Sequence, residues 1–291
     1  DDANTWWNRE DKPFKGVPYI VKRNGITYEY AYDEETGKSA KIYEKLPDGT
    51  ERRWYEENGN REYEFLPDGT ERRWHENGNK ESELLPDGTK RWFYRKNGNK
   101  QSELLPDGTI RQFYENGNKK SEHLPDGTFR EWYENEQLKK ESLPDGTRHE
   151  WYENGQIERI SLPKGTSRTW YENGNRRSKY LRDGTKRTWY ENGNKESELL
   201  PNGTRREWHE NSQKKYERLP NGVQRSWYEN GQRESEDFPN GISRSWYENG
   251  QLEFERTNGR IREYNENGEE RYYQTAKTDK DATDYFNRTK Q

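Results

Sequence analysis

A tandem repeat of about 19 residues constrains this sequence more than any other feature. Its unit is close to P-D-G-T-x-R-x-W-Y-E-N-G-N-x-x-S-E-L-L and recurs twelve times, starting near Pro47. The glycines of its first turn are 20, 19 and 20 residues apart, then 19 apart seven times, and finally 18 apart. A unit of this length is about half of a two-helix repeat, so the chain is predicted to stack small β units. The glycines are Gly49, Gly69, Gly88, Gly108, Gly127, Gly146, Gly165, Gly184, Gly203, Gly222, Gly241 and Gly259.

Each copy carries two turn signals, Asp-Gly or Asn-Gly after proline and Asn-Gly after Trp-Tyr-Glu. These dipeptides tolerate positive φ and close β-hairpins. The segments between them are rich in Thr, Ser, Trp and Tyr, which favour strands. We therefore predict an all-β fold, an elongated single-sheet antiparallel β-hairpin repeat array of about 12 copies of 19–20 residues with two strands each.

The ends of the chain differ from the repeat. We expect an N-terminal cap in residues 1–23, the array in residues 24–269 and a C-terminal cap in residues 270–291. A degenerate first copy runs from Asn24 to Gly37, and a short helix is expected around residues 281–288. The cap segments would cover the two open edges of the sheet, which are aggregation hazards when exposed.

The composition excludes a thick core, because hydrophobic residues make up 25% of the chain and aromatic residues alone 14%. The abundance of rings argues against disorder, although charged residues reach 37%. A net charge of −4 excludes a global field that attracts nucleic acid. No apolar run approaches a membrane span, and the absence of cysteine excludes disulfides and thiolate sites. A start at Asp1 without methionine fits either a processed secretory protein or a trimmed chain. We expect a secreted or cell-surface location, with a cytoplasmic one as the alternative.

Cross-strand charges test the register. A two-residue Asn-Gly turn at Gly193 would pair Trp189 with Glu196 and Arg187 with Glu198. The same rule brings an arginine opposite a glutamate in nine of the twelve copies, with one bulge allowed in two of them. The Leu-Pro-Asp-Gly-Thr turn is predicted as a type I turn with a glycine bulge, and its register also places arginine beside glutamate. Exposed pairs contribute only ~0.2–1 kcal/mol each, so we expect them to set register more than stability.

The register places one aromatic row on each face of the sheet. The face with the arginines carries tryptophans, and we expect the long side chains of Glu81, Lys120, Arg177 and Glu234 between those rings. The opposite face carries tyrosines. The tryptophan row either packs the sheet or forms a stacking platform for glycans or a protein. The candidate binding row is Trp132, Trp151, Trp170, Trp189, Trp208, Trp227 and Trp246.

The alternation of charges fails in the middle of the array. Successive cross-strand neighbours there are His149, Ile160, Arg168 and Lys179, followed by Arg187. Arginine is lost to histidine in the copy in which glutamate is lost to isoleucine, as a real contact predicts. Lys179 lies between two arginines, which is repulsive. This irregular patch marks either a kink or a contact with a partner.

No catalytic constellation is present. The four histidines are scattered over different copies, and the Asp-Gly pairs are better explained as turns than as calcium ligands. The ladder carboxylates are expected to be paired, and none lies beside a predicted cleft. We therefore expect a protein that is not an enzyme, with no catalytic residues, no metal and no cofactor.

The core W-Y-E-N-G-Q, intact at residues 151–156 and 227–232, resembles the bacterial variant of the MORN repeat. The resemblance covers roughly residues 24–270. It implies stacked β-hairpins that act as a scaffold or binding surface, and some bacterial members are antitoxins of toxin–antitoxin systems. Eukaryotic relatives are often linked to membrane lipids, but E-S-E-L replaces the glycines usual in the second half of the repeat.

Three functions follow as hypotheses. The first is a non-enzymatic scaffold that binds a protein through one face of the sheet. The second is an antitoxin or immunity protein that neutralises one cognate toxin, and the third is a carbohydrate-binding array that uses the tryptophan row. A single tight partner should contact the irregular copies, whereas glycan binding should be spread evenly over the repeats.

Overall fold

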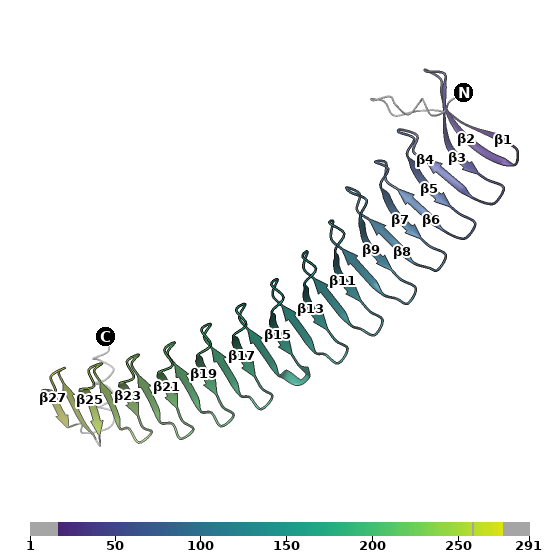
Figure 1. The fold of residues 1–291 in the computed structure, drawn as a ribbon. Helices are drawn as coiled ribbons and strands as arrows, with labels where there is room; N and C mark the ends of the chain where they lie inside the picture. Colours follow the sequence, from purple (N-terminus) through teal and green to yellow (C-terminus); the bar gives the residue numbers. More distant parts are fainter. Residues whose placement is uncertain (1–16, 258, 276–291) are drawn as a thin grey trace. The chain divides into compact units, whose positions relative to one another are not determined.

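A computed structural model describes residues 17–257 and 259–275 of the chain. These residues form 27 strands and one 3₁₀ turn at Pro163–Gly165, labelled η2. The chain divides into two compact units, Asp1–Pro144 and Asp145–Gln291. Within each unit, every strand pairs antiparallel with the next strand along the chain, as expected for an array of hairpins (Figure 1).

The strands of the first unit are β1 (Val17–Arg23), β2 (Ile26–Asp33), β3 (Lys38–Lys45), β4 (Glu51–Trp54), β5 (Arg61–Phe65), β6 (Glu71–Trp74), β7 (Lys80–Leu84), β8 (Lys90–Phe93), β9 (Lys100–Leu104), β10 (Ile110–Phe113), β11 (Lys119–His123), β12 (Phe129–Trp132) and β13 (Leu138–Ser142). The strands of the second unit are β14 (Arg148–Trp151), β15 (Ile157–Ser161), β16 (Ser167–Trp170), β17 (Arg176–Tyr180), β18 (Lys186–Trp189), β19 (Lys195–Leu199), β20 (Arg205–Trp208), β21 (Lys214–Arg218), β22 (Gln224–Trp227), β23 (Arg233–Asp237), β24 (Ser243–Trp246), β25 (Leu252–Thr257), β26 (Arg260–Tyr264) and β27 (Glu270–Thr275).

The strand order follows the repeat. Among the described residues, β4–β27 supply two strands for each of the twelve copies, and β1–β3 form the degenerate copy. Two of these strands, β1 and β27, lie within the segments that the sequence assigns to the caps. The helix expected around residues 281–288 lies outside the described residues.

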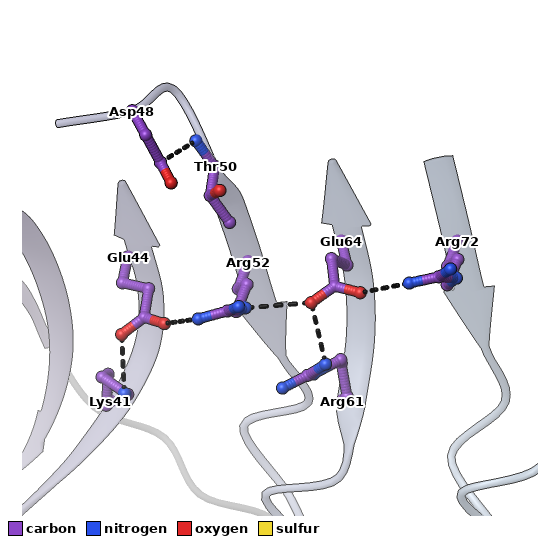
Figure 2. Close-up of polar contacts among 8 residues, drawn as sticks. All are labelled: Lys41, Glu44, Asp48, Thr50, Arg52, Arg61, Glu64 and Arg72. Carbon is purple, nitrogen blue, oxygen red and sulfur yellow. Dashed lines mark hydrogen bonds and ion pairs between the residues drawn. The ribbon is translucent and has the colours of Figure 1, made fainter. Parts of the chain in front are cut away.

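The proline turn forms as predicted. The Leu46 N–H donates to the Thr50 carbonyl oxygen (2.9 Å), and the Gly49 N–H donates to the Leu46 carbonyl oxygen (3.1 Å). The Asp48 carboxylate accepts a bond of 2.8 Å from the Thr50 N–H (Figure 2). Gly49 has a φ of 93°, which explains why glycine recurs at this position.

The Asn-Gly turn is longer than the predicted two residues. The Tyr190 N–H donates to the Asn194 carbonyl oxygen (2.9 Å), so three residues form the loop between them. The Gly193 N–H donates to the Tyr190 carbonyl oxygen (2.9 Å), and Gly193 adopts a φ of 89°. This is a type I turn followed by a left-handed glycine, which is the usual three-residue hairpin loop.

A bulge after this turn restores the predicted charge register. Trp189 pairs with Lys195, and the bulge leaves Glu196 without a cross-strand partner before the ladder resumes. The predicted pairing of Trp189 with Glu196 is therefore wrong, whereas the pairing of Arg187 with Glu198 is confirmed. The extra loop residue and the bulge compensate for each other, and the same bulge occurs in the other Asn-Gly hairpins of both units.

The most buried row of the sheet is polar. The threonine that follows most of the proline turns is almost fully covered, as at Thr109 with 2% of its surface exposed. Among the described residues, only Ala31, Ala40, Val223 and Ile261 are buried hydrophobic residues. The sheet therefore has no thick apolar core, in agreement with its composition.

Candidate binding surface

Arginines and glutamates alternate across consecutive strands on one face of each unit. We call this row the ladder, and we call its side of the sheet the Trp face because it also carries the tryptophan row. Arg52 on β4 donates from Nε to Glu64 on β5 and from Nη1 to Glu44 on β3, both at 2.9 Å (Figure 2). Arg72 on β6 donates to the second oxygen of Glu64 at 3.1 Å. A carboxylate of the ladder can thus be held from both sides, as the sequence predicted.

The ladder carboxylates are buried, unlike the exposed pairs expected from the sequence. Only 5% of the surface of Glu64 is exposed, because the arginine stems of the neighbouring strands cover it. Burial alone would raise the pKa of Glu64. Hydrogen bonds from Arg52 and Arg72 and the charge of Arg61 outweigh burial, so the pKa of this carboxyl lies below its ordinary value.

A second cation joins most ladder carboxylates to an aromatic ring. Lys100, the first strand residue after an Asn-Gly turn, bonds Glu103 at 2.8 Å and lies 4.8 Å from the centroid of the Phe113 ring. Lys119 likewise bonds Glu122 at 3.3 Å. The ladder and the aromatic row are therefore one network in which cations cover the rings.

The residues expected between these rings lie on the other face. Lys120 stands over the ring of Tyr114 at 5.7 Å, and Arg177 stands over the ring of Tyr171 at the same distance. The cause is the bulge, which turns the second residue after each Asn-Gly turn away from the Trp face. The expectation is wrong for Glu81, Lys120, Arg177 and Glu234.

The candidate row of seven tryptophans is half-buried throughout. Cations cover five of these rings within the described residues. Trp151 instead contacts the ring of His149 at 5.7 Å. Trp170 has no covering cation in the described chain, because Ile157 occupies the position of the usual lysine. The covered rings are Trp132 by Lys119 (4.8 Å), Trp189 by Arg176 (5.5 Å), Trp208 by Lys195 (4.9 Å), Trp227 by Lys214 (5.0 Å) and Trp246 by Arg233 (6.0 Å).

The irregular patch forms a continuous row across β14–β17. His149 pairs with Ile160, Ile160 with Arg168, and Arg168 with Lys179, as the register predicted. Lys179 also pairs with Arg187 on β18. Among the described residues, neither Arg168 nor Lys179 forms an ion pair, and the buried Nε of Arg168 has no hydrogen-bond partner. The structure thus brings all four patch residues together on the Trp face.

The same stretch of chain concentrates positive charge. Residues 159–187 contain nine lysines and arginines but only two acidic residues, Glu172 and Asp183. The chain as a whole has a net charge of −4, so this excess is local. The break in the ladder lies at its centre.

The opposite face, which we call the Tyr face, carries the tyrosine row. The hydroxyl of Tyr190 donates to the backbone carbonyl oxygen of Trp208 in the next copy (2.8 Å), and Tyr55 bonds Trp74 in the same way (2.6 Å). Where histidine replaces tyrosine, His209 Nε2 reaches the Trp227 carbonyl oxygen at 3.1 Å, as its position in the row suggested. These tyrosines connect neighbouring hairpins.

The asparagines of the turns also connect copies. The Asn192 side chain accepts a bond from the Asn194 N–H (2.9 Å) and donates to the Glu210 carbonyl oxygen in the next turn (3.3 Å). Asn194 donates to the same carbonyl oxygen at 2.7 Å. Together with the tyrosine contacts, these bonds explain the W-Y-E-N-G-N core as a device for stacking hairpins.

Four large apolar side chains of strands β4–β27 are exposed on the Tyr face of their units. They are Ile110 (43% exposed), Trp92 (40%), Tyr180 (38%) and Leu199 (37%). Tyr180 and Leu199 line a hollow of the second unit together with three cations, Lys186, Arg205 and Arg218. These four residues were not predicted from the sequence. For Trp92 and Ile110 the available signal is an apolar residue at a repeat position that is polar in most other copies, whereas Leu199 is the first leucine of S-E-L-L and carries no such signal.

A family model described as MORN repeat variant matches six segments of the chain. Each match covers about one copy of the repeat, and five of them begin at the proline of the first turn. These matches support the resemblance to MORN repeats. The matched residues are 67–85, 106–124, 125–143, 182–200, 220–238 and 239–258.

Solved structures with similar strands have low identity to this chain. The TCP10 domain of Danio rerio CPAP, solved in complex with a peptide of Danio rerio STIL, is 19% identical, with 81% of this chain and 99% of that chain covered and a TM-score of 0.19. The TCP10c domain of Drosophila melanogaster Sas-4 is 16% identical, with 65% and 96% covered and a TM-score of 0.18. Among curated proteins, none matches the sequence.

No group of three or more His, Asp or Glu side chains in residues 17–257 and 259–275 is arranged to hold a metal ion. No helix in this part of the chain has the length and apolar character needed to cross a membrane.

Proposed function

We propose that this protein is a non-enzymatic repeat scaffold that binds a protein partner through the Tyr face. The observation that carries the proposal is the exposure of Tyr180 and Leu199 among mostly polar side chains on the Tyr face of the second unit. Trp92 and Ile110 are exposed in the same way on the Tyr face of the first unit. Large apolar side chains surrounded by polar ones are typical of protein contact sites.

Each repeat combines positions that recur and hold the hairpins together with positions that vary from copy to copy, and this combination supports a scaffold. The recurring Trp, Tyr, Asn, Arg and Glu residues engage one another or the next hairpin, as in the contacts of Tyr190 and Asn194. The positions between them differ from copy to copy without disturbing the strands. Such an array can present a variable surface on a constant backbone.

Two leucines of similar exposure provide a matched test. Leu199 on the Tyr face is 37% exposed, and Leu162 in the turn that contains η2 is 38% exposed. We expect Leu199→Thr to weaken binding of a partner captured by the wild-type protein by about tenfold, whereas Leu162→Thr leaves it unchanged. Affinities are measured by calorimetry with the captured partner. Equal affinities for wild type and Leu199→Thr would reject the Tyr face as the contact surface.

A narrower proposal makes the partner a toxin that this protein neutralises. It rests on the resemblance of the W-Y-E-N-G-Q core to bacterial MORN variants and on the irregular β14–β17 region, which suits one tight partner. Co-expression with the product of the neighbouring gene tests it, because an antitoxin restores growth that the toxin alone stops. A secreted or cell-surface location is proposed for the scaffold and a cytoplasmic one for the antitoxin, which fractionation distinguishes.

A carbohydrate-binding function has weaker support from the geometry. Glycans stack on open rings, but cations cover five of the seven tryptophans of the candidate row. A glycan array with the wild type and Trp208→Ala tests this alternative. Binding that falls in the variant would favour it over the protein scaffold.

A further inference from the structure

The break in the ladder leaves cations without acidic neighbours on the Trp face of the second unit. In a regular copy, the arginine Nε donates to the carboxylate of the following strand, as Arg206 does to Glu217 at 2.9 Å. The strands that flank Arg168 carry Ile160 and Lys179 instead. Within the described chain, the Nε of Arg168 is buried and has no hydrogen-bond partner.

We propose that β15–β18 bind a carboxylate-rich segment of a partner protein. Its Asp or Glu side chains take the place that glutamates hold elsewhere in the ladder. Arg168 and Lys179, on successive strands, supply the unpaired charge, and Arg187 lies beside Lys179 on the next strand. The surrounding residues 159–187 carry nine basic and two acidic side chains, so the potential here favours an acidic ligand although the whole chain has a charge of −4.

The buried Nε of Arg168 is not an ordinary feature of the ladder. The Nε of Arg91 also lacks a hydrogen bond of good geometry, but it lies 3.5 Å from Glu103 and is therefore paired in charge. Arg168 has no carboxylate within ion-pair distance among the described residues. A buried donor without an acceptor is unfavourable, and a ligand carboxylate would satisfy it.

An apolar surface adjoins these cations. Trp170 follows Arg168 by two residues on the same strand and the same face, and no cation covers its ring in the described chain. Ile157 and Ile160 on β15 replace the lysine and the glutamate of a regular copy. The aliphatic part of a glutamate side chain can pack against these groups while its carboxylate reaches Arg168.

The break in the ladder is short, which favours a short acidic segment of a protein over a nucleic acid as its ligand. Arg187 is already bonded to Glu198 at 2.6 Å, and Glu217 and Glu236 are buried on the same face farther along. A long polyanion that crosses the strands would meet these carboxylates and be repelled. A segment with a few carboxylates ends within the gap.

This site goes beyond the proposed contact surface, because it lies on the opposite face of the sheet from Leu199. The two proposals can therefore fail separately. Loss of partner binding in Leu199→Thr concerns the Tyr face, whereas the experiment below concerns the ladder of the Trp face.

The test is to complete the ladder with Lys179→Glu in the full chain. The new carboxylate would lie between Arg168 and Arg187, as Glu198 lies between Arg187 and Arg206. We expect the midpoint of thermal unfolding to rise by about 1–3 °C. The affinity for a fluorescent oligoglutamate peptide at low salt is expected to fall by about tenfold.

Two further variants sharpen the result. Lys215→Glu makes the same change of charge at an exposed position, and it should keep both the wild-type affinity and the wild-type midpoint. Arg168→Gln removes the unpaired charge and should weaken oligoglutamate binding by about tenfold without restoring the ladder.

Three outcomes would overturn the proposal. In the first, Lys179→Glu binds oligoglutamate as tightly as the wild type. In the second, Lys179→Glu unfolds at a lower temperature than the wild type. That result would mean that a carboxylate between Arg168 and Arg187 is not stabilising. In the third, a single-stranded oligonucleotide of equal charge binds the wild type more tightly than oligoglutamate and is lost in Lys179→Glu, which would assign the site to phosphate.

Discussion

Two stretches of the ladder differ in chemistry but share one backbone register. In the first unit, Arg52 lies between two glutamates, Glu44 and Glu64. In the second unit, Arg168 lies between Ile160 and Lys179. The strands pair in the same way in both stretches, so the ion pairs are not required to hold the register of every hairpin.

Turn hydrogen bonds, a tyrosine contact and a β-bulge hold the register where the ladder has no ion pairs. The turn before β16 keeps its bond from the Leu162 N–H to the Thr166 carbonyl oxygen (2.8 Å). The hydroxyl of Tyr171 still bonds the Trp189 carbonyl oxygen (2.9 Å), and the bulge before Trp170 is present. Register is therefore redundantly determined, and the ladder can lose its charges without loss of strand pairing.

The largest predicted difference between the two stretches is the loss of hydrogen-exchange protection at low pH. Although burial favours the protonated form, hydrogen bonds from arginine and lysine hold the pKa of Glu44, Glu64, Glu83 and Glu103 below the ordinary value of 4.5. A lowered folded pKa gives stability that is present above the unfolded pKa and is lost as the pH falls through the folded value. Hydrogen-exchange protection of β5–β9 should therefore fall below about pH 4.5, while β16 and β17 change little. Parallel losses in both stretches would contradict the comparison.

A charge reversal in the regular stretch should have the next largest effect. Glu64→Lys places a fourth cation beside Arg52, Arg61 and Arg72 and brings together like charges, as at Lys179, in a buried setting. We expect the free energy of unfolding in urea to fall by about 3 kcal/mol, because three arginines lose their buried acceptor. The control Glu62→Lys changes an exposed neighbour and should cost less than about 0.5 kcal/mol. Equal losses would show that burial of the ladder carboxylate is unimportant.

Removal of a tyrosine hydroxyl should affect both stretches equally. Tyr152→Phe deletes a bond of 2.8 Å to the Trp170 carbonyl oxygen beside the ladder break, and Tyr55→Phe deletes the corresponding bond of 2.6 Å to the Trp74 carbonyl oxygen in the first unit. Each should lower the free energy of unfolding by about 1 kcal/mol, because a partly buried carbonyl oxygen loses a donor. Tyr180→Phe, on an exposed ring, is the control with little expected effect. A much larger loss in one stretch would mean that the two do not share the same connection between copies.

The smallest predicted effect is an increase in the free energy of unfolding. Ile160→Glu returns an acid to one side of Arg168 and should raise the free energy of unfolding by about 0.5 kcal/mol. Ile110→Glu, on the Tyr face, is the control and should give no gain, because its strand partners are Leu104 and His123. Urea unfolding measures both. A loss of stability in Ile160→Glu would mean that the neighbourhood of Arg168 rejects a carboxylate.

Much of the fold could be predicted because its determinants are local. The dipeptides at Gly49 and Gly193 mark turns wherever they occur, and opposite charges such as Arg187 and Glu198 identify strand partners. The four residues of the irregular patch also lie where the register placed them. Their function was not decided by that register.

The faces of individual side chains were harder to predict. The bulge at Glu196 has no dipeptide signature, and it moved residues such as Lys120 and Arg177 to the Tyr face. Exposure of Leu199 depends on the side chains of neighbouring strands, which a single copy of the repeat does not specify.

The amino-acid sequence alone determined the repeat, the turns and the partner of each strand. All three depend on short segments that recur at a nearly constant spacing. Burial followed from the assembled sheet. Glu64 is shielded because the stems of Arg52 and Arg72 from adjacent strands, and of Arg61 from its own strand, lie over it. Arg168 lacks an acceptor because two other strands bring Ile160 and Lys179 beside it. Such environments arise from several strands at once, and so they appear only when the strands are packed together.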